Sequence, residues 1–304
     1  MAQNKHGWLI AIPAIIVIGL IGVVIYQGIH QQTDAKQSNK INVVASLDSY
    51  GEMAQAVLGN QGAVTSIIAD PDVDPHEFEP TTADAKIYQK ADVIISNGGG
   101  FDDWSVRFAK QNEQAKSINL ANIYHYTDDS ATGNEHFWYK TDVAQRLTKR
   151  LVQQYAAIEP DKRAYFQKNA NRYIKSLDHV FAMQRQVKVA LQGKKLMATE
   201  PVFNNTLFAL GATVLDQSFA QAVDEQQDPT PAAIRAWHQA IDDGQVAAVI
   251  YNPQSTGKLV DQAKDYAKEH GVAIVEARET RPTGKTYAEW QYTQLKALDE
   301  ALKK

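Results

Sequence analysis

Two histidines and two glutamates of this 304-residue chain each follow a segment with the apolar pattern of a β-strand. Imidazole nitrogens and carboxylate oxygens together form a donor set that suits Zn²⁺, Mn²⁺ or Fe²⁺ and suits Ca²⁺ or Cu(I) poorly. Because ligands of open α/β sheets bind beyond the carboxyl ends of strands, we expect all four side chains at one cleft. These candidate metal ligands are His76, His136, Glu200 and Glu279.

His76 lies in the most unusual of these loops, DPDVDPHEFEPT, at residues 70–81. A histidine of a protein core would lie within a periodic apolar segment, and a solvated histidine would not need a restrained backbone. Pro75 and Pro80 restrict the backbone on both sides of this imidazole. The acids around it are expected to cap, orient and attract cations more than to ligate.

Each candidate also has an ordinary structural explanation. A loop histidine is more often solvated than metal-bound, and a carboxylate after a strand is most often a helix cap, a role open to Glu200 before Pro201. Glu279 has two arginine neighbours with which it could form an ion pair. Spacing by itself therefore leaves the metal site open, and three further carboxylates remain possible ligands: Glu77, Glu79 and Glu276.

The elements that would position these residues alternate between strand and helix. Apolar runs of strand length are separated by segments with helical spacing, which predicts parallel sheets flanked by helices. The predicted strands are 41–45, 64–68, 91–96, 117–120, 195–199, 212–215, 246–251 and 272–277.

The middle of the chain lacks strand patterns. From Pro160 to Leu191 nothing breaks the helical pattern, which predicts one helix of about 30 residues, or about 45 Å, and a rigid connector. The expected fold is therefore α/β, with two Rossmann-like lobes, each a mainly parallel sheet flanked by helices, joined by one long rigid helix. The expected division is an N-terminal lobe at 41–158, a connecting helix at 159–192 and a C-terminal lobe at 193–304.

The N-terminus predicts a membrane anchor. Residues 8–26 carry no charge over nineteen positions, nearly enough to span a hydrocarbon core of about 30 Å. No small-residue cleavage pattern follows, so we interpret residues 1–26 as an uncleaved anchor rather than a cleaved signal sequence, and 27–40 as a linker. The chain has no cysteine, which excludes thiolate ligands and lipid attachment through cysteine. A net charge of −4 gives no basic surface for nucleic acid.

Several motifs resemble those of the solute-binding proteins of zinc and manganese ABC importers. Residues 70–104 are similar to the family's D-P-H-x-x-x-P-(S/T) loop with its following helix, strand, N-G turn and tryptophan. NEHFWYK resembles the family's N-P-H-x-W segment, and TEPVFNNTLFALGATVL resembles a third ligand segment. DPTPAAI (228–234) and TGKTYAEWQYTQLKAL (283–298) also match, so the resemblance covers residues 41–304.

The resemblance implies His76, His136 and Glu200 as ligands, and Glu279 where many members have an aspartate. Departures from the family are a 121–135 loop without a histidine-rich tract and an apparent membrane anchor in place of a lipid-modified cysteine. Two carboxylates and the absent histidine tract favour Mn²⁺, whereas the Irving–Williams order favours Zn²⁺, so both ions stay open.

We therefore expect a receptor on the outer face of the cytoplasmic membrane, not an enzyme. It would be a monomer that passes a divalent metal ion to an ABC permease with a cytoplasmic ATPase. Other possibilities are a receptor for an organic solute, an adhesin and a surface zinc hydrolase, although no H-E-x-x-H motif supports the last.

Overall fold

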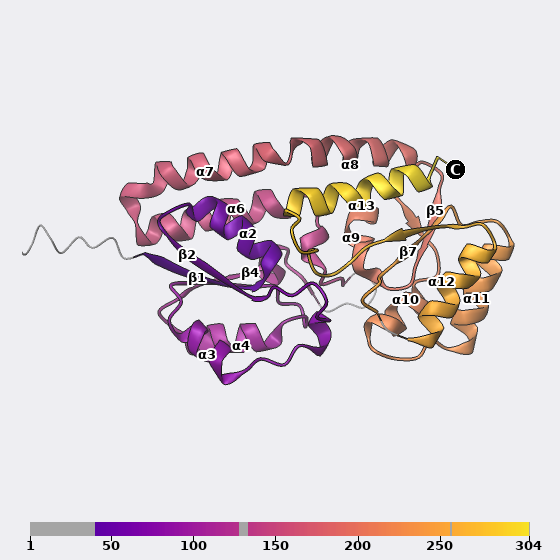
Figure 1. Cartoon of the computed structure of the whole chain (residues 1–304), viewed down its shortest axis with the longest axis horizontal. Coiled ribbons are helices and arrows are strands. Elements are labelled where there is room, and N and C mark those ends of the chain that lie inside the picture. The colour runs from indigo at the N-terminus through magenta and orange to yellow at the C-terminus, as the bar shows by residue number, and fades with distance from the viewer. Residues whose placement is uncertain (1–39, 128–132, 256, 304) are drawn as a thin grey trace, which may run out of the picture. The chain divides into compact units, whose positions relative to one another are not determined.

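In the computed structural model, residues 40–127, 133–255 and 257–303 are described, and they contain two separate four-stranded sheets. Every pair of neighbouring strands is parallel. The first sheet has the order β2-β1-β3-β4 and the second β6-β5-β7-β8 (Figure 1). The strands are β1 (Ile41–Leu47), β2 (Gly62–Ile68), β3 (Val93–Ser96), β4 (Lys116–Asn119), β5 (Lys195–Ala198), β6 (Thr213–Val214), β7 (Ala248–Tyr251) and β8 (Ala273–Glu276).

The predicted strands and fold class are confirmed. Strands covered by helices on both faces read as continuous apolar runs, and all four residues of β3, VIIS, are buried. The central strand β1 pairs on both sides, with Val43 opposite Val64 and Val93. In each sheet the first strand in sequence lies between the second and the third, so each sheet has a topological switch point.

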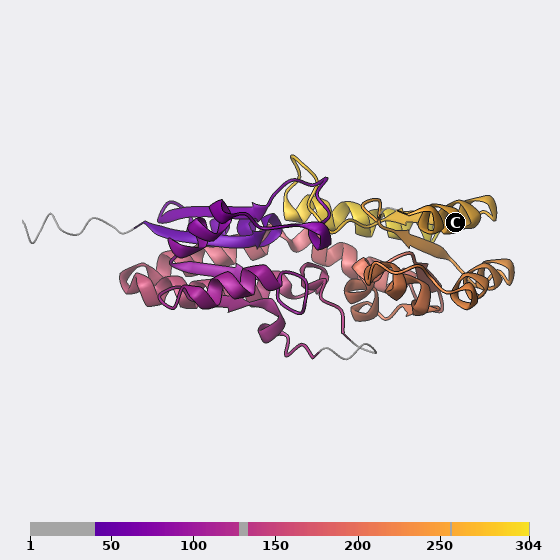
Figure 2. The same cartoon turned by 90° about the horizontal axis from the view of Figure 1, so that it is seen from below.

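The helices cover both sheets and connect them. Figure 2 shows the same elements from a second direction. The α-helices are α2 (Asp48–Leu58), α3 (Thr82–Gln89), α4 (Asp103–Gln111), α5 (Leu120–Ile123), α6 (Val143–Ile158), α7 (Arg163–Ser176), α8 (Asp178–Ala190), α9 (Asn204–Ala209), α10 (Gln217–Asp224), α11 (Pro231–Asp242), α12 (Lys258–Glu269) and α13 (Tyr287–Ala301), and the 3₁₀ helices are η1 (Pro75–Glu77), η2 (Phe137–Tyr139), η3 (Pro160–Lys162) and η4 (Pro201–Phe203).

The connector is not the single helix that the sequence predicts. It consists of η3, α7 and α8, with Leu177 between the two α-helices. The N–H of Leu177 donates to Ile174 O, a tighter turn than that of an α-helix, and Ser176 Oγ donates to the carbonyl of Tyr173. A serine hydroxyl that bonds a carbonyl of the preceding turn bends helices. Leu177 is itself buried.

Helix α10 was not predicted at all. It is short, and its apolar pattern is carried mainly by Phe219, Ala220 and Val223. Asp216 caps its first turn by accepting from Ser218 N–H. The signals available in the sequence were the Asp216 cap and the apolar pair Phe219 and Val223, which are four residues apart.

The connector packs on both lobes: α7 contacts α2 and α6 of the N-terminal lobe, and α8 contacts α13 (Figure 1). One buried apolar cluster includes residues from β1 and β3 of the first sheet and from β5 and β7 of the second. A smaller cluster around Trp237 belongs to the C-terminal lobe. The two lobes therefore share a continuous core.

The expected anchor at 1–26 lies outside the described residues, as does the linker 27–40 except for Lys40. Among the residues that the structure describes, none of the helices is both long and apolar enough for a membrane span.

A candidate metal centre between the two lobes

His76 is positioned by the proline-bounded loop that follows β2. It is the middle residue of η1, which begins at Pro75, and its N–H donates to Asp74 Oδ1 at 2.9 Å. The imidazole lies edge-on to the ring of Phe101, with 5.1 Å between the centroids. Its Nε2 atom is buried and has no hydrogen-bond partner among the described residues. Asp74 therefore orients this loop, as expected from the sequence.

His136 is completely buried in the loop before η2. Its Nδ1 lies 3.2 Å from Asn134 Oδ1, an acceptor, so Nδ1 carries the hydrogen and Nε2 keeps its lone pair. Within the described part of the chain, Nε2 is buried without a hydrogen-bond partner. The ring of Trp138 lies edge-on to the imidazole, with 5.2 Å between the ring centroids.

Asn134, which the sequence analysis did not single out, connects His136 to the C-terminal lobe. Its Oδ1 also accepts from Asn205 Nδ2 at 2.7 Å, and its Nδ2 donates to Pro201 O at 2.8 Å. Asn205 in turn donates to the carbonyl of His136 at 2.9 Å. The orientation of this imidazole is therefore determined by residues of both lobes.

Glu279 brings a carboxylate from the second sheet to the two histidines. Its Oε2 lies 3.6 Å from His76 Nε2 and lacks a hydrogen-bond partner in the described ranges. Its Oε1 accepts from Asn252 Nδ2 at 3.0 Å. Donor atoms of His76, His136 and Glu279 all lie within 4.8 Å of one another. We call these three residues the donor triad.

Glu200 lies beside the donor triad but does not belong to it. Its carboxylate is buried, and Oε2 accepts from Asn252 Nδ2 at 2.5 Å and from the hydroxyl of Ser255. Asn252 thus bridges Glu200 and Glu279. It directly follows β7, so the strand-end argument that found the four candidates could have found this residue too.

The site contains a further carboxylate that the sequence analysis missed. Asp224 Oδ1 lies 3.8 Å from His136 Nε2, is buried and has no hydrogen-bond partner among the residues described. Asp224 ends α10 rather than following a strand, so a search of strand ends passes over it. Asp224 and Glu135 also form a second group of potential donors with His76.

The three alternative carboxylates do not join these groups. Glu77, Glu79 and Glu276 are exposed, and none of them belongs to a cluster of potential metal donors in the described part of the chain.

Burial controls protonation in this site. The pKa of His136 is held well below its usual range, mainly by desolvation and to a smaller extent by the neighbouring His76, so its imidazole is neutral. Desolvation raises the pKa of Glu279 well above its ordinary value, and the nearby Glu200 charge and a hydrogen bond with Glu200 raise it further. Desolvation and then Glu135 raise the pKa of Asp224 to about 9. Without a cation, these carboxylates therefore hold protons near neutral pH.

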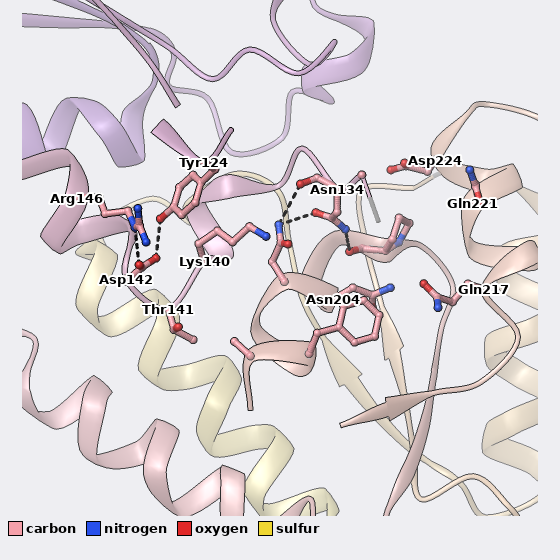
Figure 3. Close-up of a pocket in the computed structure, with 15 residues that line it drawn as sticks. Tyr124, Asn134, Lys140, Thr141, Asp142, Arg146, Asn204, Gln217, Gln221 and Asp224 are labelled. Atoms are coloured by element: carbon pink, nitrogen blue, oxygen red, sulfur yellow. Dashed lines mark hydrogen bonds and ion pairs between the residues drawn. The ribbon is translucent and has the colours of Figure 1, made fainter. Parts of the chain in front are cut away.

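Two cavities meet at Asp224. The one of about 290 Å³ is lined by residues that include His76, Glu200 and Asp224. Figure 3 shows a larger one, of about 440 Å³, whose lining includes Asn134 and Asp224 but no member of the donor triad. Amide and charged side chains from both lobes line the larger one, including Lys140 and Asn204.

The residues fit a divalent transition-metal ion. Two buried imidazole nitrogens and a buried carboxylate oxygen lie close together without hydrogen-bond partners among the described residues, an arrangement that costs free energy unless a cation binds. Nitrogen and oxygen donors of this kind suit Zn²⁺, Mn²⁺ and Fe²⁺. The fold and this site thus define a two-lobed protein with a cation-binding centre between its lobes.

Comparison with known proteins agrees with this class. The chain matches the family described as "Zinc-uptake complex component A periplasmic" over residues 43–301, and it belongs to that family. This confirms the resemblance inferred from the motifs. It also confirms that the chain is not an enzyme, because the family is one of transport components.

Individual relatives are distant. The chain is 22% identical over 266 residues to the metal ABC transporter substrate-binding lipoprotein SloC of Streptococcus mutans, covering 81% of this chain and 83% of the relative. It is 22% identical over 242 residues to the high-affinity zinc uptake system protein ZnuA of Bacillus subtilis, covering 74% and 75%. A manganese-bound mutant periplasmic metal binding protein from candidatus liberibacter asiaticus superposes with a TM-score of 0.74 at 17% identity, covering 86% of this chain and all of that one.

Proposed function

We propose that this chain is an extracytoplasmic receptor that binds one divalent transition-metal ion, Zn²⁺ or Mn²⁺, between its lobes and delivers it to an ABC permease. The observation that carries this proposal is the donor triad, whose three donor atoms come from both lobes and lie within 4.8 Å of one another. The names of the relatives, which include a zinc uptake protein and a metal ABC transporter component, support the same role.

His76, His136, Glu200 and Glu279 are the proposed ligands. The two imidazoles donate nitrogen, and the two carboxylates offset the charge of the ion. Glu200 enters the set through the oxygen that Asn252 and Ser255 do not bond. A centre closed by four protein ligands leaves little room for a reactive water, so the chemistry is binding and release rather than turnover.

We further propose that residues 1–26 anchor the receptor to the outer face of the cytoplasmic membrane as a monomer. SloC is named a lipoprotein, but this chain contains no cysteine to carry a lipid, so an apolar N-terminal segment replaces that anchor. The body then consists of an N-terminal lobe at 41–158, a connector at 159–192 and a C-terminal lobe at 193–304. The partner is a permease with a cytoplasmic ATPase.

The test is a measurement of metal content and of the thermal shift with Zn²⁺ or Mn²⁺, made on the purified protein. The wild type is compared with a His76→Ala/His136→Ala double variant and with His179→Ala, which removes an exposed imidazole of α8. We expect wild type and His179→Ala to bind about one ion and to gain several degrees in Tm, because a ligand that binds only the folded state stabilises it. The double variant is expected to show neither effect.

A wild type that gains no stability with either ion contradicts the proposal. A wild type that hydrolyses model esters or peptides only when metal is bound would instead favour the hydrolase alternative.

A further inference from the structure

Asp224 is a half-buried acid whose buried Oδ1 faces His136, and the proposed function assigns it no role. Its Oδ1 lies 3.8 Å from His136 Nε2, and both atoms are buried without hydrogen-bond partners in the described part of the protein. The other pair of such atoms, His76 Nε2 and Glu279 Oε2, is 3.6 Å apart. Donor atoms that share one ion lie about 3–4 Å apart, because each bond to the metal is about 2.0–2.2 Å long. The distance between Asp224 and His136 is therefore as suitable for sharing one ion as the distance between Glu279 and His76.

Helix α10 holds Asp224 in this place. Phe219 buries one face of the helix against Trp237, with 4.7 Å between ring centroids. After Asp224 the chain turns at Gln226, whose φ of 55° is a left-handed conformation that glycine usually adopts. Bonds from Gln226 N to Val223 O and from Gln227 N to Ala222 O close this helix end. The carboxylate is thus presented by a packed helix with a closed terminus rather than by a free loop.

The position of Asp224 is electrostatically unfavourable unless a cation is near. It is the last residue of α10, where the helix dipole is negative and disfavours an acid. Its potential donor atoms lie near those of His76 and of a second acid, Glu135. A bound divalent ion would offset both the unfavourable helix dipole and the repulsion between the two acids. The completely buried His136, with its free Nε2, is the second and independent indication that a cation belongs here.

We propose that Asp224 is an additional ligand of the transported ion and that it selects Mn²⁺ over Zn²⁺. This inference rests on the proposed function. With Asp224 the centre has two nitrogen and three carboxylate donors, more than the four ligands that Zn²⁺ usually takes in a closed protein site. Mn²⁺ accepts higher coordination numbers and prefers oxygen donors, so the added carboxylate contributes more to Mn²⁺ binding than to Zn²⁺ binding.

The test compares Asp224→Asn with wild type and with Glu225→Gln, using the full-length protein. Glu225 is the next residue and is exposed, and it accepts a hydrogen bond from Gln221, so its substitution removes one negative charge nearby without removing a donor from the site. Affinities for Mn²⁺ and Zn²⁺ are measured by competition with a chelating dye. Thermal unfolding of the metal-free proteins checks that each variant folds.

We expect Asp224→Asn to weaken Mn²⁺ binding at least tenfold and Zn²⁺ binding less than threefold, while Glu225→Gln changes both less than twofold. In the Co²⁺-loaded proteins, visible absorption is expected to be weak for wild type and stronger for Asp224→Asn, because a lower coordination number intensifies the metal-centred bands.

If Asp224→Asn behaved like Glu225→Gln, the assignment of Asp224 as a ligand would be overturned. An equal loss of affinity for both ions would overturn its role in selecting Mn²⁺. Neither result would touch the proposed function. A wild type that binds neither ion would instead overturn the proposed function and this inference with it.

Discussion

At the scale of single residues, the candidate centre combines the neutral imidazole of His136 with carboxyl groups that hold protons in the absence of a cation. His136 is neutral because burial holds its pKa well below the usual range, and Asn134 directs its Nε2 into the site. Glu279 and Asp224 show the opposite shift, since burial raises the pKa of both carboxyl groups. A divalent ion must therefore displace protons from carboxyl groups rather than from His136.

The first prediction concerns those protons. At pH 7, below the pKa of about 9 for Asp224, we expect binding of one ion to release at least one proton. The sign follows from the raised pKa values: the metal-free protein holds the protons, and the ion favours the ionised carboxylates. Release is expected to decline toward zero above about pH 9, where the carboxylates are already ionised. Titration calorimetry in buffers of different ionisation enthalpy measures the number of protons.

A heat of binding that does not depend on the buffer at pH 7 would contradict this prediction.

The same raised pKa values stabilise the metal-free fold at low pH. This contribution is lost as the pH rises from the pKa values of the unfolded chain, near 4, through the raised pKa values of the folded protein.

At the scale of secondary structure, most elements follow from local patterns, and the differences have physical causes. Central strands such as β3 (VIIS) and β7 (AVIY) are apolar runs, and the positions of the eight described strands could be predicted to within a few residues. The connector could not be predicted in detail, because the bend at Leu177 depends on a serine hydroxyl and on burial rather than on proline or glycine. Helix α10 was missed because it is short.

The second prediction tests the connector. Leu177 is almost completely buried at the bend between α7 and α8, so Leu177→Ala leaves a cavity where both helices meet the core. We expect it to lower the free energy of unfolding by about 2–4 kcal/mol, as buried leucine-to-alanine changes do. Because Leu177 does not belong to the groups of potential donors, metal affinity in the folded protein is expected to change less than twofold.

Denaturant unfolding and a metal titration check the two halves of this prediction. The exposed Val189 of α8 provides the matched control, since Val189→Ala removes apolar atoms from the same connector without opening a cavity. If Leu177→Ala changed metal affinity tenfold, the connector would be part of the binding machinery rather than a spacer.

At the scale of the whole described body, the two lobes are joined by a shared core and by hydrogen bonds that surround the metal centre. Gln254 of the C-terminal lobe donates to the carbonyls of Pro71 and Val73 in the loop that carries His76, both at 3.2 Å. Its Oε1 accepts from the N–H of Glu279 at 2.8 Å. One side chain thus couples a proposed ligand of each lobe. Such contacts fit small loop movements on binding and release better than a wide hinge opening.

The third prediction follows from this coupling. Gln254→Ala removes the links between the His76 loop and Glu279 while leaving every proposed ligand in place. We expect metal affinity to fall about tenfold, mainly through faster dissociation, because residues that orient ligands typically contribute a factor of about 10–100. Stopped-flow transfer of the ion to a chelator measures the rate.

Gln153→Ala is the matched control, because it removes an exposed glutamine side chain of α6 that does not contact the proposed ligands. An unchanged dissociation rate in Gln254→Ala would show that the loops keep their positions without this side chain.

The sequence by itself determined the two-lobed α/β fold and its strand positions, and it proposed four candidate donor residues after strands. It did so because apolar periodicity, proline-bounded loops and donor chemistry are local properties. Only the tertiary structure decided which donors converge. It places His76, His136 and Glu279 close together. Glu200 lies beside them and accepts hydrogen bonds from Asn252 and Ser255. Asp224 reaches His136 from the end of a helix. That selection depends on how two sheets and α10 pack around a common core, and no local pattern carries this information.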